Sequence, residues 1–165
     1  MKNKIFIFDL DDTVIDSSHR ATLKADSLEL DLDAWRKDST YENIMNDKLL
    51  PLAGFMNDCI KSDNAYVWVC TARNMQQADH DFLAKWDLTP NLVLSRQLDD
   101  DTADDLLKRK MIRKMLNLKP FRDCEVIFFD DKPKNLKALE DIVDYSLHAP
   151  SINNAKTVPL YWENS

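Results

Sequence analysis

Short apolar segments that alternate with amphipathic ones constrain the fold of this chain more than any other feature. The apolar segments are rich in β-branched and aromatic residues, as buried parallel strands are, and they cover residues 5–8, 65–70, 92–94, 126–129 and 145–147. Apolar residues between them recur at helical spacing over 52–60, 75–86, 106–116 and 133–140. Strands that alternate with helices predict an α/β fold with a doubly wound parallel sheet.

The polar segment 14–50 interrupts this alternation. It carries one weak helical stripe that includes Leu32 and Trp35, and it is too small for a second domain. Such a segment is typical of a flap over a site. The chain has 165 residues and no linker or low-complexity stretch. We therefore expect a single domain over residues 1–165, with a flap at about 14–50 and no large cap domain.

Glycine occurs once, as Gly54. The P-loop and the usual dinucleotide-binding motif each need several glycines, because their backbone amides must approach phosphates closely. Both motifs are therefore excluded. Any phosphate chemistry in this chain must depend on side chains.

Cysteine usage and net charge bear on compartment and partners. Cys59, Cys70 and Cys124 have no metal-ligand or redox spacing and are expected to be reduced. No segment resembles a signal peptide or a membrane span, so we expect a cytoplasmic protein without a membrane partner. The net charge of −7 argues against binding along an extended nucleic-acid backbone. The sequence leaves the oligomeric state open.

Acidic residues follow two of the predicted strands. Asp9 and Asp11 come at the end of the first strand, and Asp130 and Asp131 follow the apolar run 126–129. Ligands bind beyond the carboxyl ends of parallel strands, so we expect these side chains to converge there. A single aspartate after a strand is usually a turn former or a helix N-cap. Two aspartates at the end of each of two strands are seldom explained in that way. Clustered carboxylates raise one another's pKa unless a cation neutralises them, and their oxygens suit Mg²⁺.

Four segments, in chain order, resemble the motifs of the haloacid dehalogenase (HAD) superfamily. They are FDLDDT at 8–13, VCTAR at 69–73, a lysine near Lys108, and FDD at 129–131. Members typically have glycine where this chain has Asp12. The dehalogenase branch lacks the second aspartate, so Asp11 points to phosphoryl transfer. The resemblance implies a Rossmannoid core and a phosphatase that uses Mg²⁺.

The resemblance also implies a role for each motif residue. Asp9 is the nucleophile that forms an aspartyl-phosphate, and Asp11 protonates the leaving oxygen and then activates water. Asp11 is expected to have a raised pKa for the first task. Asp9, the Asp11 backbone carbonyl and Asp130 would hold Mg²⁺, with Asp131 binding it directly or through water. Thr71 and one lysine would neutralise the phosphoryl oxygens.

Several cations compete for the role of that lysine. The predicted helix carries Lys108, Arg109, Lys110, Arg113 and Lys114. We choose Lys108 over Lys110 because it lies in the first turns of the helix, and Asp104, one turn earlier, can orient its ammonium. The remaining cations are expected to form a solvated face with pairs at i and i+4, such as Asp105 with Arg109.

A narrower similarity involves Arg20, Arg73 and the pair formed by Asp104 and Lys108. Together with the motif at 129–131, this combination resembles the 3′-phosphatase domain of bacteriophage polynucleotide kinase/phosphatase. The kinase half is absent. The resemblance implies that Arg20, Arg73 and Asp104 support the site or the substrate phosphate, although Arg20 could equally be a surface residue of the flap.

These observations predict a Mg²⁺-dependent phosphomonoesterase that acts on a nucleotide or on the 3′-phosphate end of a nucleic acid. The alternatives are a small-molecule phosphatase or 5′-nucleotidase, and a non-catalytic HAD scaffold that binds phosphorylated ligands. Trp35 could stack on a nucleobase or anchor the flap. The three histidines share no ligand spacing, so we read His19, His80 and His148 as surface or flap residues.

Overall fold

A five-stranded parallel sheet forms the centre of the computed structural model, which describes residues 2–20 and 31–155. The strand order is β5 (Leu92–Ser95), β4 (Ala65–Thr71), β1 (Lys4–Phe8), β6 (Glu125–Asp130) and β7 (Tyr145–His148). Each of these strands was predicted from its apolar run. Because β1 lies in the middle and every neighbouring pair is parallel, the carboxyl ends of all five strands lie on one edge.

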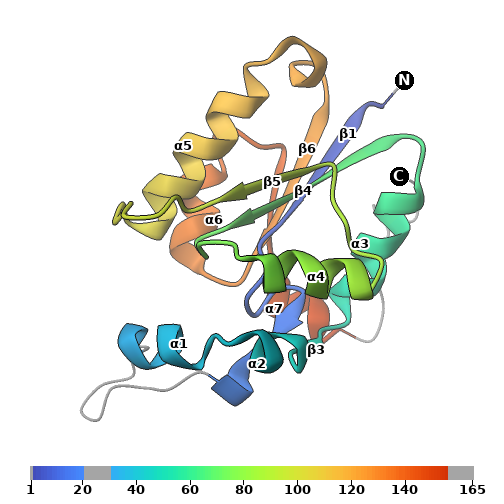
Figure 1. Ribbon diagram of the computed structural model, residues 1–165. Coiled ribbons are helices and arrows are strands. Elements are labelled where there is room, and N and C mark those ends of the chain that lie inside the picture. The colour runs from blue at the N-terminus through green and yellow to red at the C-terminus, as the bar shows by residue number, and fades with distance from the viewer. Residues whose placement is uncertain (1, 21–30, 156–165) are drawn as a thin grey trace.

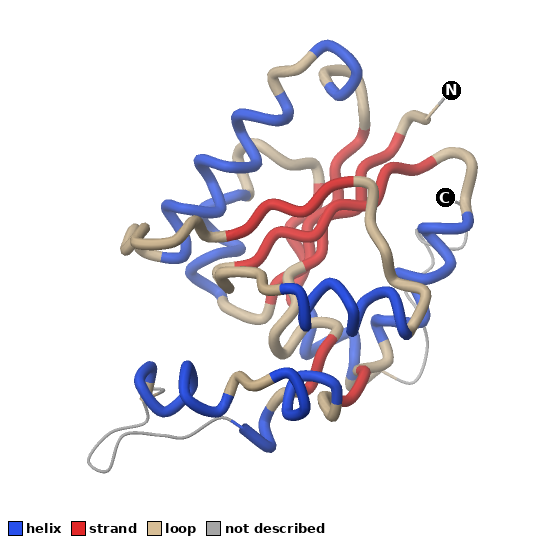
Figure 2. Tube along the Cα trace, viewed as in Figure 1, coloured by secondary structure: helices blue, strands red, loops and turns tan. Residues whose placement is uncertain are grey.

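Helices cover both faces of this sheet (Figures 1 and 2). On one face lie α3 (Leu52–Lys61), α4 (Gln77–Lys85) and α7 (Ala149–Asn153), and on the other lie α5 (Asp104–Leu116) and α6 (Pro133–Leu139). The short helix η2 (Lys119–Phe121) connects α5 to β6. The doubly wound α/β fold is confirmed.

The alternation of side chains along β1 builds the two halves of the core. Phe6 and Phe8 face the cluster that contains α3 and α4, whereas Ile5 and Ile7 face the cluster that contains α5 and α6. Phe8 stacks on Phe129 of β6 with ring centroids 4.8 Å apart. Each such fully buried side chain stabilises the fold by roughly 1.5–3 kcal/mol. Side chains on both faces of β1 thus pack into the core and fix the strand that leads into Asp9.

The polar segment between β1 and α3 forms a small substructure of its own. It contains β2 (Ile15–Asp16), η1 (Ser18–Arg20), α1 (Leu32–Asp38), α2 (Tyr41–Met45) and β3 (Lys48–Leu49). The strands β2 and β3 pair antiparallel, and α2 packs against α4. Residues 21–30 of the predicted flap lie outside the described part of the chain.

The cysteines and the helices bear on the expectations about thiols and membrane spans. Cys59 and Cys70 are buried free thiols, and Cys124 is a partly exposed one. In the described ranges, no helix has the length and apolar character needed to cross a bilayer.

Candidate active site

The loop after β1 turns sharply so that its acidic side chains can gather at the sheet edge. Asp12 adopts the left-handed conformation, with φ of 60°, at the position where HAD proteins typically have glycine. The amide of Asp12 donates to the carbonyl of Ile15, and the amide of Thr13 donates to that of Leu10. Aspartate is one of the few residues besides glycine that tolerates this conformation, so the departure from the motif leaves the turn intact.

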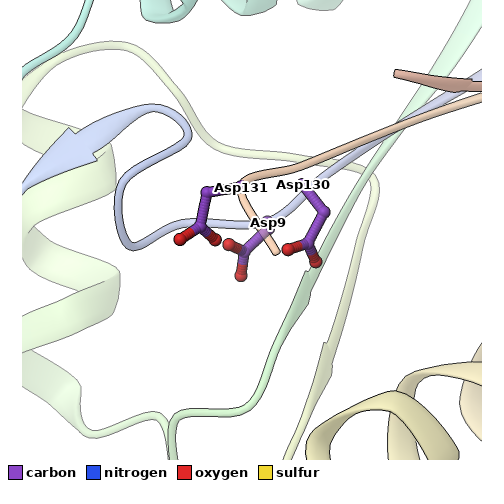
Figure 3. Close-up of side chains that lie close together, drawn as sticks. All are labelled: Asp9, Asp130 and Asp131. Atoms are coloured by element: carbon purple, nitrogen blue, oxygen red, sulfur yellow. The ribbon is translucent and has the colours of Figure 1, made fainter. Parts of the chain in front are cut away.

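Three carboxylates from β1 and β6 converge beyond the strand ends. Asp9, Asp130 and Asp131 each offer an oxygen, and these oxygens lie within 4.8 Å of one another. Figure 3 shows the three side chains close together, Asp9 after β1 and the other two at the end of β6. Such a set of oxygen donors fits a hard divalent cation like Mg²⁺. Three of the four carboxylates expected to converge thus lie together, whereas the carboxylate of Asp11 is bound by Arg73.

Lys108 reaches this cluster from α5. Its Nζ lies 2.8 Å from Asp9 Oδ1 and 2.6 Å from Asp130 Oδ2, and the side chain is almost fully buried. Lys110, two residues later, is exposed. The structure thus places Lys108, and not Lys110, against the acidic residues.

The carboxylates of this cluster raise one another's pKa. Burial raises the pKa of Asp9 to about 6, with Asp130 adding to the effect and Lys108 opposing it. Burial also raises the pKa of Asp131 to about 9, helped by the charge of Asp9 and a hydrogen bond with it. Both shifts have the direction expected for carboxylates crowded together in a buried site.

Neighbouring groups hold Asp9 and Asp130 in place. The hydroxyl of Thr13 donates to Asp9 Oδ2 at 3.2 Å. Asp130 Oδ1 accepts from the backbone amide of Lys132 at 2.9 Å and from Asn135 Nδ2 at 3.2 Å. Asn135 is buried and lies in the first turn of α6, where it resembles any polar residue near a helix start. Nothing in the sequence distinguished it.

Asp11 is held by a guanidinium instead of carrying a proton. Arg73 Nε donates to Asp11 Oδ2 at 2.8 Å and Nη2 donates to Oδ1 at 2.5 Å, and Ser17 Oγ donates to Oδ1 at 2.8 Å. Burial alone would raise the pKa of Asp11, but the charge and hydrogen bonds of Arg73 outweigh it and leave the pKa below its usual value. The raised pKa expected for Asp11 is therefore wrong for the free protein.

Arg73 also contacts the start of α4. Its Nη1 donates to Asp79 Oδ1 at 2.6 Å, while Asp79 Oδ2 accepts from the backbone amide of Gln76 and closes the N-terminal cap of α4. Thr71, at the end of β4, is buried, and its hydroxyl accepts from the Arg73 amide at 3.0 Å. Thr71 and Arg73 are thus placed by one turn after the strand.

Arg20 forms a buried ion pair within the flap. Its Nε and Nη2 donate to the two oxygens of Asp47 at 3.0 and 2.8 Å, and Nη1 donates to Ser39 Oγ at 2.7 Å. The guanidinium also lies over the Trp35 ring, 4.3 Å from its centroid. The described contacts of Arg20 thus go to other residues of the flap.

Asp104 does not pair with Lys108 as expected. Its Oδ1 accepts from Arg96 Nη2 at 2.8 Å, and its Oδ2 accepts from Lys132 Nζ at 3.0 Å. Asp105 also does not pair with Arg109 as expected: within residues 2–20 and 31–155, Arg109 pairs with Asp141, and Asp105 lies 3.8 Å from Lys134 Nζ. The ammonium of Lys108 binds Asp9 and Asp130 instead.

Two acidic residues of the site were missed from the sequence. Asp47 and Asp79 are buried and both lie within 4.0 Å of Arg73 nitrogens. Asp47 stands in a polar segment that has no motif, so no local signal singles it out. Asp79 could have been found as the third residue of a helix that follows the VCTAR motif, where a carboxylate can close a capping box.

The fold, the contact of Lys108 with Asp9 and the convergent carboxylates agree with the resemblance of the sequence motifs to the HAD superfamily. The model of the family described as bacteriophage T5 5′-deoxynucleotidase matches residues 1–158. The chain belongs to this family. It is also similar to the 5′-deoxynucleotidase of Escherichia phage T5, with 38% identity over 85 residues, which are 50% of this chain and 35% of that protein. The match thus spans about a third of the relative's length.

Solved structures share the fold at lower identity. A haloacid dehalogenase-like hydrolase from Streptococcus pneumoniae has a TM-score of 0.63 and 11% identity, over 94% of this chain and 93% of that one. A HAD-superfamily hydrolase from Geobacter sulfurreducens has a TM-score of 0.57 and 15% identity, over 90% and 93%. The Pnkp1/Rnl/Hen1 RNA repair complex contains a chain with a TM-score of 0.55 and 19% identity, over 84% of this chain and 39% of that one. These similarities show the fold.

Proposed function

We propose that this chain is a phosphomonoesterase that releases phosphate from deoxynucleoside 5′-monophosphates through an aspartyl-phosphate on Asp9. The contact that carries the proposal is that of Lys108 with Asp9 and Asp130 at the carboxyl ends of β1 and β6. A buried ammonium beside a nucleophilic carboxylate can neutralise phosphoryl oxygens when the substrate arrives. Membership of the deoxynucleotidase family supports the substrate class.

In the first step, an oxygen of Asp9 attacks phosphorus and the bond from phosphorus to the ester oxygen breaks. Asp11 gives its proton to the departing alkoxide. The free protein holds Asp11 as a carboxylate against Arg73. A phosphate dianion competes for that guanidinium and, as a neighbouring negative charge, favours the protonated form of Asp11. Substrate binding thus prepares Asp11 for its role as an acid.

In the second step, Asp11 takes a proton from a water molecule as the water oxygen attacks phosphorus. The bond between phosphorus and the Asp9 oxygen breaks, which regenerates the carboxylate and releases inorganic phosphate. Dividing hydrolysis between two displacements lowers the barrier of each. Thr71, buried at the end of β4, supplies a hydroxyl for the phosphoryl group.

Mg²⁺ is the cofactor we propose. Asp9, Asp130 and Asp131 would hold it, together with the Asp11 backbone carbonyl. When bound, the ion would supply charge stabilisation to the phosphoryl group. The three convergent carboxylates support this assignment. Asp131 is oriented toward Asp9, which supports a direct ligand role over a contact through water.

A 3′-phosphate of a nucleotide or nucleic-acid end is the second candidate substrate. It is favoured by the arrangement of Arg20, Arg73 and Asp104 along the sequence. In the structure, however, Arg20 is paired with Asp47 and Asp104 with Arg96 and Lys132, so we rank the 5′-deoxynucleotide first.

We also propose that the chain is a single domain and that it is cytoplasmic. Its net charge of −7 argues against binding along an extended nucleic acid.

The test is a substrate panel with Mg²⁺. It comprises matched deoxynucleoside 5′- and 3′-monophosphates, a 3′-phosphate oligonucleotide, a sugar phosphate and a nitrophenyl phosphate. We expect the 5′-monophosphates to be hydrolysed with the highest kcat/KM, and a rapid burst of nitrophenol when breakdown of the intermediate is slow. A preference for the 3′-phosphates would replace the first candidate with the second. No hydrolysis of any of them would leave a scaffold that only binds phosphorylated ligands.

A further inference from the structure

We propose that Asp47 is a positioning residue, through which the flap sets the orientation of Arg73 and thereby of Asp11. This inference rests on the proposed phosphatase activity and adds a residue that neither the motifs nor the family resemblance assigns. Asp47 follows α2 and directly precedes β3. It belongs to the flap, whereas Arg73 belongs to the loop after β4.

The carboxylate of Asp47 is fully buried and has partners on three sides. Oδ1 lies 2.8 Å from His19 Nε2 and 3.0 Å from Arg20 Nε, and Oδ2 lies 2.8 Å from Arg20 Nη2. The same Oδ2 is 3.6 Å from Arg73 Nη2. The two guanidiniums therefore meet at one flap carboxylate.

The Nη2 atom of Arg73 lies between two carboxylates that belong to different parts of the protein. It donates to Asp11 Oδ1 at 2.5 Å and faces Asp47 Oδ2 at 3.6 Å. Asp79 restrains the other terminal nitrogen, Nη1. A guanidinium is a rigid plane. Carboxylates at several of its nitrogens therefore determine both its position and the orientation of the plane. Asp47 is the one of these three anions that the flap supplies.

The flap reaches Arg73 through a second contact as well. The Trp35 ring of α1 lies over Arg20, and Arg73 lies 5.8 Å from the same ring centroid. Asp47 and Trp35 thus bring the flap against the residue that holds Asp11. If Asp47 acted only by neutralising Arg20, its removal would change stability and leave the Arg73 plane unaffected.

The experiment is a double-mutant cycle between Asp47→Asn and Arg73→Gln, with kcat and KM measured on a nitrophenyl phosphate and a deoxynucleoside monophosphate. We expect Asp47→Asn to lower kcat about tenfold or more with little change in KM, since misplaced catalytic groups cost this much. In the Arg73→Gln background the same change should alter kcat by less than about twofold. Ser39→Ala removes a hydrogen bond of Arg20 and serves as the control, with kcat near that of the parent.

Thermal unfolding of each variant accompanies the kinetics, and Asp47→Glu keeps the charge. We expect Asp47→Glu to retain more kcat than Asp47→Asn, and the cycle is run with the glutamate variant if the asparagine variant does not fold. Equal fold losses in both Arg73 backgrounds, or a change in KM alone, would overturn the positioning role. A parent protein that hydrolyses neither substrate would instead overturn the proposed function.

Discussion

Lys108 and Asp9 are 99 residues apart in the chain, and the Lys108 ammonium lies 2.8 Å from the Asp9 carboxylate. Both side chains are almost fully buried. The attraction of Lys108 to Asp9 and Asp130 raises the pKa of the ammonium well above its usual range, although burial alone would lower it. This ion pair ties α5 electrostatically to the end of β1.

Replacing this lysine separates its role from that of its exposed neighbour. We expect Lys108→Met to abolish most phosphatase activity and to lower the free energy of unfolding, measured without Mg²⁺, by about 3–5 kcal/mol, because two buried carboxylates lose their cation. Lys110→Met, on the exposed side of the same helix, should leave both quantities near the parental values. Urea unfolding and initial rates test this pair, and equal effects of the two changes would contradict the assignment of Lys108.

The acid role of Asp11 predicts a dependence on the leaving group. Asp11→Asn should lose the most activity on deoxynucleoside monophosphates and retain more on a nitrophenyl phosphate, whose leaving oxygen needs little protonation. Asp12→Asn, a matched change one residue later on the exposed part of the loop, should preserve the ratio between the two substrates. The ratio of kcat/KM values is the measurement. Equal losses on both substrates would argue against Asp11 as the acid.

The raised pKa of Asp131 predicts that Mg²⁺ binding releases protons. The folded-state pKa of about 9 exceeds the ordinary value, so between about pH 4 and pH 9 Asp131 holds more of its proton in the folded protein than in the unfolded chain. The contribution of Asp131 to stability should therefore fall as pH rises through this range. A bound cation favours the carboxylate, so near pH 7.5 its binding should expel a proton.

Titration calorimetry in two buffers with different ionisation enthalpies measures this release. We expect close to one proton per Mg²⁺ for the parent at pH 7.5 and a markedly smaller release for Asp131→Asn. Binding without any proton release in the parent would show that Asp131 is already ionised or does not contact the ion.

The buried pair of Arg20 and Asp47 should matter far more for stability than an exposed pair of the same type. We expect Arg20→Met to lower the free energy of unfolding by about 3–5 kcal/mol, because Asp47 is then left buried with fewer partners. Arg109→Met, which breaks the exposed pair with Asp141, should have little effect. Denaturant unfolding of the two variants provides the comparison. Similar small losses of stability in both variants would show that the buried pair stabilises the fold no more than the exposed one does.

The strands and the carboxylates at their ends could be predicted because both depend on local pattern. An apolar run of four to six residues fixes where a strand ends, and parallel pairing then brings Asp9 and Asp130 to the same edge. Lys108 could be placed because it lies in the first turns of α5, although Asp104, which was expected to orient it, binds other residues. These features need no knowledge of how distant polar side chains pair.

The partners of the arginines could not be predicted in the same way. Arg20 pairs with Asp47 across 27 residues in a segment without periodicity, and Arg73 could have bound several of the nearby carboxylates. The sign of the Asp11 pKa shift depends on that choice. Asp104 was assigned to Lys108 because the two are four residues apart, yet Arg96 and Lys132 from other segments bind it instead.

The short antiparallel pair of β2 and β3 closes the flap at its base. Ile15 lies opposite Leu49 and Asp16 opposite Lys48, so the chain leaves the core and returns to it at the same place. Changing the length of a loop closed in this way costs only about 0.6 kcal/mol per doubling. Loop entropy alone therefore sets only a weak limit on the length of the segment between the two strands. A change of length there would leave Asp9 and Lys108 in place, because both lie outside the segment.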